Sequence, residues 1–140
     1  MKVFLDTSVL LSACGSSKGA SRYVVENADS KDWELVSSLY CREETLRNLC
    51  KLGLDAENYF SVRIERGIKW KTDVVVRDRI VMFPKAKDRP VILTALAEQC
   101  AVLLTLDRVD FQKSVGGQFY AMAIRTPGDW LIELRDKGLI

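Results

Sequence analysis

The sequence contains no histidine, and this absence removes a large group of chemistries. Histidine is the most frequent general base in enzymes and the commonest metal ligand in proteins. Catalysis by histidine and metal sites built on histidine are therefore excluded. The four cysteines do not fill that gap, because no pair has the close spacing of a zinc knuckle or a redox motif. We expect them to be ordinary core or surface residues.

Long hydrophobic runs are absent as well. No apolar stretch approaches the roughly 20 residues of a membrane-spanning helix. The first apolar run, residues 3–5, is too short for a secretory signal and is followed by an acid. We therefore expect a cytoplasmic protein that makes no use of a membrane.

A strong net charge is also lacking, since the chain carries a formal charge of +2. A mild excess of basic residues does not by itself indicate nucleic-acid binding, which would need a local basic patch. The chain has 140 residues, 48% of them hydrophobic, and shows no repeat or linker. We therefore expect one domain over residues 1–140.

Short apolar runs alternate with helix-like segments along the chain. We expect strands at 2–5, 33–37, 74–76, 101–105 and 121–124, and residues 80–83 are expected to extend the third strand or to form the next one. Helices are expected at 20–28, between Ser38 and Gly53, at 55–70 and 89–99, and from 126 onward. Residues 7–13 are expected to form an apolar turn or short helix, and residues 108–114 a loop or short helix. Because the strands are continuous apolar runs, the pattern predicts an α/β fold with a mainly parallel sheet covered on both faces.

Several residues predict how the helices begin, end and pack. Ser38 and Thr126 are suited to cap helix N-termini, with Asp129 placed to complete the second cap, and Gly53 is suited to end a helix. Side chains at helical spacing are expected to face the core: Tyr23, Val24 and Ala28; Tyr40, Leu46 and Leu49; Tyr59, Val62, Ile64 and Ile68.

Four acidic positions stand where strands end or helices begin. Asp6 and Asp107 follow apolar strands, Glu44 lies early in a helix beside Glu43, and Asp88 precedes a helix. Ligands of parallel α/β folds bind beyond the carboxyl ends of the strands, where Asp6 and Asp107 fall. Carboxylates without histidine suit Mg²⁺ or Mn²⁺ and metal-assisted hydrolysis of a phosphodiester.

Each of these acids also has a purely structural explanation. Asp6 and Asp88 would serve as N-caps of the helices that follow them. An acid in the first turn of a helix, such as Glu44, is favoured by the helix dipole. Asp107 would suit the start of a turn. The order and setting of the four acids together nevertheless favour a shared site.

Four segments together resemble the PIN-domain family of nucleases. They are LDTSVLLSA at 5–13, SLYCREETLRNL at 38–49, KDRPVILTALAEQCAVLLTLDRVDF at 87–111 and TPGDWL at 126–131. The last segment is similar to the ending of the subfamily of toxins from toxin–antitoxin pairs. The resemblance implies a three-layer α/β/α fold around the parallel sheet.

The resemblance also implies the site. Asp6, Glu44, Asp88 and Asp107 map onto the catalytic, metal-binding acids of the family, and Ser8 and Thr105 map onto polar positions that support them. Glu44 fits the family pattern better than Glu43, but neighbours on a helix point about 100° apart, so both stay open. We expect Asp110 to add an outer-sphere contact. Lys85, Lys87, Arg89 and Arg108 bracket two of the acids and are expected to contact phosphate.

The expected activity is that of a Mg²⁺- or Mn²⁺-dependent ribonuclease acting on single-stranded or structured RNA. The resemblance implies a toxin that pairs with a cognate antitoxin protein and forms a homodimer. A housekeeping RNA-processing nuclease and an inactive scaffold that binds RNA or protein remain as alternatives. A haloacid-dehalogenase-like phosphatase is disfavoured, because Ser8 stands where its second aspartate is needed. The acid spacing does not fit a receiver domain either.

Overall fold

The structure is a computed structural model that describes residues 1–74, 88–107, 118–119 and 122–140, with only the backbone described at 88–90 and 118–119. The described residues form a six-stranded sheet in the order β3-β2-β1-β4-β6-β5. Its strands are β1 Lys2–Leu5, β2 Glu34–Ser38, β3 Lys69–Lys71, β4 Val102–Leu104, β5 Gln118–Phe119 and β6 Met122–Arg125. All neighbouring pairs are parallel except β5 and β6. The mainly parallel sheet is thereby confirmed.

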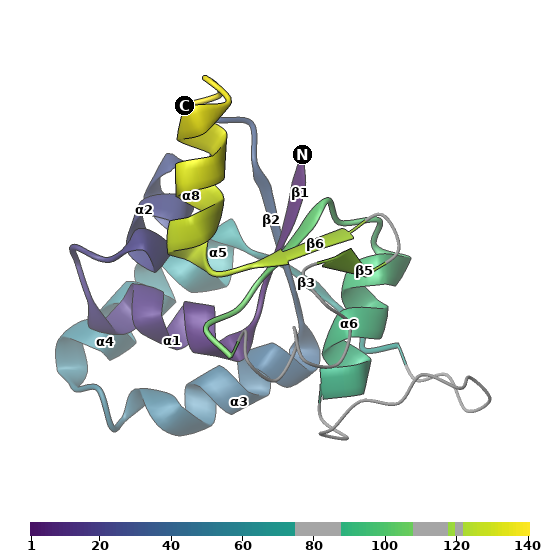
Figure 1. Ribbon diagram of the computed structural model, residues 1–140. Coiled ribbons are helices and arrows are strands. Elements are labelled where there is room, and N and C mark those ends of the chain that lie inside the picture. Colours follow the sequence, from purple (N-terminus) through teal and green to yellow (C-terminus); the bar gives the residue numbers. More distant parts are fainter. Residues whose placement is uncertain (75–87, 108–117, 120–121) are drawn as a thin grey trace.

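Helices cover both faces of this sheet. They are α1 Thr7–Gly15, α2 Ala20–Asn27, α3 Leu39–Leu49, α4 Leu54–Tyr59, the π-helix η1 Phe60–Ile64, α5 Glu65–Gly67, α6 Asp88–Ala97 and α8 Pro127–Asp136. Figure 1 shows α6 on one side of the sheet and α2 and α8 on the other, with α3 along the end at which β1 finishes. The expected three-layer α/β/α fold is confirmed. No helix among the described residues is long and apolar enough to cross a membrane.

The central strands β1 and β4 form the middle of the core. Phe4, Leu5, Leu103 and Leu104 are completely buried, which explains why both strands are continuous apolar runs. Their register places Leu5 opposite Leu104. The two strands therefore end level with each other, and the residues that follow them emerge side by side. The backbone N–H of Asp6 donates to the carbonyl of Leu104 at 3.0 Å and holds these ends together.

The strand order changes direction between β1 and β4. From β1 the chain continues to β2 and β3 on one side, whereas β4, β6 and β5 extend the sheet on the other side. Loops that leave such neighbouring strands diverge, so a crevice opens beyond their carboxyl ends. The fold thus places Asp6 and the loop after β4 on either side of one crevice.

The predicted N-caps are confirmed. The Ser38 hydroxyl accepts a hydrogen bond from the N–H of Cys41 at 3.1 Å, and the Thr126 hydroxyl accepts one from the N–H of Asp129 at 3.1 Å. The predicted stop at Gly53 is wrong, because α3 ends at Leu49. Gly53 instead turns the chain into α4 with a φ of 99°, a conformation that side chains other than glycine rarely adopt.

The segment from 55 to 76 departs most from the prediction. The helix ends at Gly67, and Lys69–Lys71 form strand β3, which was predicted mostly as helix. Val74 lies outside any strand, and the other residues predicted as strand at 75–76 and 80–83 lie outside the described part, as does the segment 108–114. The π-helix η1 has more residues per turn than an α-helix, so faces assigned at α-helical spacing shift within it.

The predicted core faces are partly confirmed. Val24, Ala28, Leu49, Ile64 and Ile68 are buried, whereas Tyr23, Leu46 and Val62 are exposed. Val62 lies two residues from both Phe60 and Ile64, which turn inward, so it falls on the opposite side of the helix. On α2, Val25 is buried next to Val24, whereas Tyr23, which was expected to face the core, is exposed. Tyr40 and Tyr59 are half-buried against the core.

Candidate functional site

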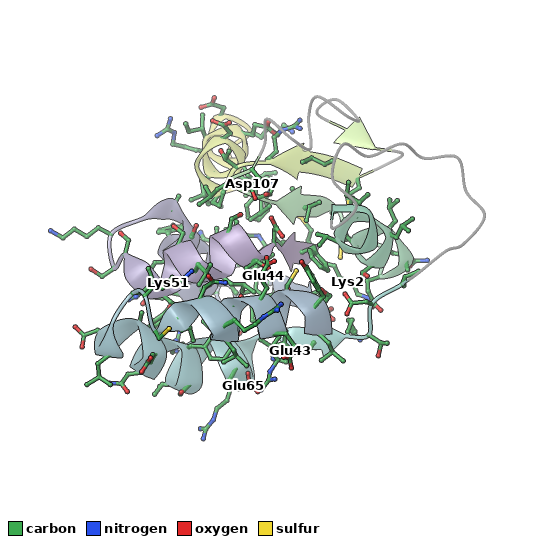
Figure 2. The ribbon with its side chains drawn as sticks, turned by 90° about the horizontal axis from the view of Figure 1, so that it is seen from below. Lys2, Glu43, Glu44, Lys51, Glu65 and Asp107 are labelled. Atoms are coloured by element: carbon green, nitrogen blue, oxygen red, sulfur yellow. The ribbon has the colours of Figure 1, made fainter. Side chains whose placement is uncertain are left out.

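A small hollow lies beyond the carboxyl ends of β1 and β4. Its lining comes from four separate segments: Asp6, Thr7 and Ser8 after β1, Tyr40 and Glu44 on α3, Val91 on α6, and Asp107 after β4. Its volume is about 20 Å³, which is room for about one water molecule or bare cation. In Figure 2, Glu44 and Asp107 approach this region from opposite sides. The structure thus brings three of the four predicted acids to one place.

Asp6 is buried at the base of the hollow. One carboxylate oxygen, Oδ2, accepts hydrogen bonds from the hydroxyls of Thr105 at 2.8 Å and Ser8 at 3.3 Å. The Cys41 thiol donates weakly to the other oxygen, Oδ1, at 3.9 Å. Asp6 occupies the N-cap position of α1, yet its side chain makes no capping hydrogen bond. Helix capping therefore does not explain this carboxylate.

The surroundings of Asp6 disfavour its charged form. Burial raises the pKa of Asp6 to about 6, the hydrogen bond from Thr105 acts in the opposite direction, and the negative charges of Asp107 and Glu44 raise it further. Burial also raises the pKa of the Cys41 thiol to about 11, so it remains a neutral donor at pH 7. A cation in the hollow would offset this cluster of negative charge.

The structure distinguishes the two neighbouring glutamates on α3. Glu44 is half-buried, lines the hollow and accepts a hydrogen bond from the Tyr40 hydroxyl at 2.9 Å. Glu43 is exposed and lies on the other side of α3, toward Glu65 (Figure 2). Glu44 is therefore the one that shares the hollow with Asp6.

Ser8 and Thr105 join the two strand ends across the crevice. Besides donating to Asp6, the Thr105 hydroxyl accepts from the N–H of Asp107 at 3.0 Å. The Ser8 hydroxyl accepts from the N–H of Leu106 at 3.0 Å. Both hydroxyls thus hold the loop that carries Asp107 in place relative to Asp6. The sequence led us to expect Ser8 and Thr105 near the acids in a supporting role.

The remaining predicted residues are described only in part or not at all. Asp88 is the first residue of α6, three positions before Val91, which lines the hollow. Only the backbone is described for Asp88 and Arg89. The predicted phosphate contacts Lys85, Lys87 and Arg108 and the predicted outer-sphere acid Asp110 lie outside the described residues.

Three polar residues of this region were not predicted. Thr7 is buried and lines the hollow, and its hydroxyl has no hydrogen-bond partner. Tyr40 packs against the core as expected, and in addition its hydroxyl donates to Glu44, which was not predicted. Asp73 follows β3 and accepts from the backbone N–H of Tyr40 at 3.0 Å. Thr7 and Tyr40 carry a signal in the sequence, since they stand one and four residues from predicted acids, whereas Asp73 carries none.

The donor set of the hollow fits a hard cation. No three acidic or cysteine side chains among the described residues converge closely enough to form a ready-made metal cluster. Mg²⁺, however, usually binds through one or two carboxylates and keeps several waters. Within the described part of the chain, the lining offers the carboxylates of Asp6, Glu44 and Asp107, and includes no lysine or arginine. These are oxygen ligands of the kind that Mg²⁺ and Mn²⁺ prefer.

The sequence was compared with those of known proteins and protein families. A search among curated proteins finds no significant match. The family profile of the PIN domain matches residues 2–109, which is more than half of the chain and contains all four predicted acids. PIN domains are generally nucleases that use divalent metal ions. The chain therefore belongs to the PIN-domain family.

Proposed function

We propose that this protein is a metal-dependent ribonuclease that hydrolyses phosphodiester bonds at the hollow between β1 and β4. One observation carries the proposal: Asp6, Glu44 and Asp107 come from distant parts of the chain and face the same small space. Such an arrangement is unfavourable without a cation, because like charges in a partly buried site repel each other. Membership of a nuclease family supports the same interpretation.

The residues take distinct roles in this proposal. Asp6 is the main direct ligand of Mg²⁺ or Mn²⁺, because it is buried and held in place by Thr105 and Ser8. Asp107 and Asp88 bind the ion directly or through water. A bound divalent ion lowers the pKa of a coordinated water and offsets negative charge that develops on the phosphate.

Glu44 lies on the opposite wall of the hollow, on α3. We assign it the orientation or deprotonation of the attacking water, because it is less buried than Asp6 and is held from one side by a hydroxyl donor. Lys85, Lys87, Arg89 and Arg108 are proposed to hold the RNA backbone, since phosphate contacts position a strand without reading its sequence.

Replacement of Asp6 by asparagine tests the proposal. The amide keeps the shape of the side chain and can still accept from Thr105, but the charge that holds the ion is lost. We expect loss of Mn²⁺ binding in calorimetry and at least a 100-fold slower cleavage of a labelled RNA, as an order of magnitude for a main metal ligand. Asp29→Asn, at an exposed aspartate just after α2, is the matched control. Full activity of the Asp6→Asn protein, with an unchanged fold, would refute the assignment.

We further propose that the nuclease is the toxin of a toxin–antitoxin pair, as the TPGDWL ending suggests. In that case its expression alone should arrest growth, and a small protein encoded beside it should relieve the arrest. A housekeeping nuclease should do neither. The antitoxin partner and the homodimer remain predictions of the resemblance.

A further inference from the structure

Tyr40 and Glu44 form a pair one helical turn apart on α3. The Tyr40 hydroxyl donates to Oε2 of Glu44 at 2.9 Å, and both side chains line the hollow. The other acids that line the hollow, Asp6 and Asp107, carry the same charge as Glu44. Repulsion from them favours rotation of the Glu44 side chain away from the hollow. A donor on the side of the hollow opposes that rotation.

The Tyr40 side chain is itself well anchored. Its ring packs against the hydrophobic core, and its backbone N–H donates to Oδ2 of Asp73 at 3.0 Å. The next residue, Cys41, is fully buried, and its N–H donates to the Ser38 hydroxyl. Two side-chain acceptors thus hold the first turn of α3. The hydroxyl of Tyr40 is therefore presented from a fixed support.

The chemistry of the phenol restricts what Tyr40 can do. A phenol has an ordinary pKa of about 10. The hydroxyl therefore keeps its proton at neutral pH, and it acts as a donor rather than as a base or an anion. A permanent donor to a carboxylate fixes the position of that carboxylate without competing for the metal.

We propose that Tyr40 is a positioning residue, which holds the carboxylate of Glu44 inside the hollow for its action on the attacking water. This inference rests on the proposed nuclease function. It separates two tasks within the site: Asp6, held by Thr105 and Ser8, binds the ion, whereas Glu44, held by Tyr40, acts on water. Removal of the Tyr40 hydroxyl should then slow the reaction while the ion and the RNA still bind.

The test uses Tyr40→Phe, which deletes only the hydroxyl. We expect kcat for Mn²⁺-dependent cleavage of a labelled RNA to fall about ten-fold, as is typical for one hydrogen bond to a charged group. The KM for RNA and the Kd for Mn²⁺ should stay within about two-fold of the wild type. Tyr59→Phe is the matched control, since its hydroxyl lies 3.5 Å from a carboxylate oxygen of Glu26 away from the hollow. Thermal unfolding verifies that both variants are folded.

A double-mutant cycle separates positioning from other roles. In a Glu44→Ala background, measured with enzyme in excess over RNA, Tyr40→Phe should change the rate by less than about two-fold, because the group it positions is gone. A wild-type rate for Tyr40→Phe, or an equal loss with and without Glu44, overturns the inference and leaves the nuclease function intact. A wild-type protein that neither binds Mn²⁺ nor cleaves RNA refutes the proposed function, and this inference with it.

Discussion

Helix α3 presents charged side chains to two very different surroundings. On its outer side, Arg42 makes a bidentate ion pair with Glu65, with the closest contact at 2.8 Å between Nη2 and Oε1. On its inner side, Glu44 faces the acids Asp6 and Asp107. The outer contact joins opposite charges and links α3 to α5. The inner arrangement gathers like charges around Asp6, whose burial disfavours its charge further.

The charges of the outer ion pair balance each other within the protein, whereas the charges of the hollow are balanced only when a cation binds. The Arg42–Glu65 pair is complete within the protein, so stability alone accounts for it. The hollow has three carboxylates, whose negative charge a bound cation would offset. We therefore expect substitutions in the hollow to affect metal binding and cleavage, and substitutions on the outer side to affect stability alone.

The largest effect is expected from a comparison of the two neighbouring glutamates. Glu44→Ala should slow Mn²⁺-dependent RNA cleavage about 1,000-fold, within the usual range for loss of an acid–base group. Glu43→Ala should change the rate less than about two-fold, because Glu43 is exposed on the outer side of α3. Single-turnover kinetics on one RNA measures both. Equal losses for the two variants would show that the inner and outer sides do not differ in function.

A smaller effect is expected in the stability of the metal-free protein as a function of pH. The pKa of Asp6 is about 6 in the folded protein, against 3.8 for an ordinary aspartate. Between these values the folded state binds more protons than the unfolded state, so the free energy of unfolding falls as pH rises and levels off above pH 6. The full change is about 3 kcal/mol.

Urea unfolding at several pH values measures this change, and Asp6→Asn isolates it. The Asp6→Asn variant should lack this part of the pH dependence and should be more stable than the metal-free wild type at pH 7. Saturating Mn²⁺ should stabilise the wild type and leave the variant unchanged, because only the folded wild type binds the ion. An identical pH dependence for both proteins would contradict the raised pKa of Asp6.

Local signals explain what the sequence could predict. Ser38 and Thr126 cap helices through contacts within three residues, and the runs in β1 and β4 are apolar because both strands are buried on both faces. These features depend on near neighbours or on burial alone. The setting of Asp6 and Asp107 follows from them, since both residues come shortly after such strands.

Contacts between distant segments explain what the sequence could not predict. Strand β3 has the sequence Lys-Trp-Lys, which carries no apolar run, and its pairing with β2 decides its conformation. Without β3, nothing indicates that Asp73 reaches the N–H of Tyr40. Glu43 and Glu44 have identical chemistry, and although the family pattern favours Glu44, the fold is what shows that Glu44 lines the hollow. These features arise from tertiary packing, which overrides local preference.

The smallest effect is expected on the outer side of α3. A double-mutant cycle of Arg42→Ala and Glu65→Ala should give a coupling free energy of about 0.5–1 kcal/mol, because the two side chains are 30% and 36% exposed and solvent screens their attraction. The coupling should shrink in high salt. RNA cleavage by the single variants should match the wild type within about two-fold, since neither residue lines the hollow. A ten-fold rise in KM for RNA on loss of Arg42 would instead mean that the outer side of α3 binds the substrate. In that case an ion pair that is complete within the protein could still take part in function.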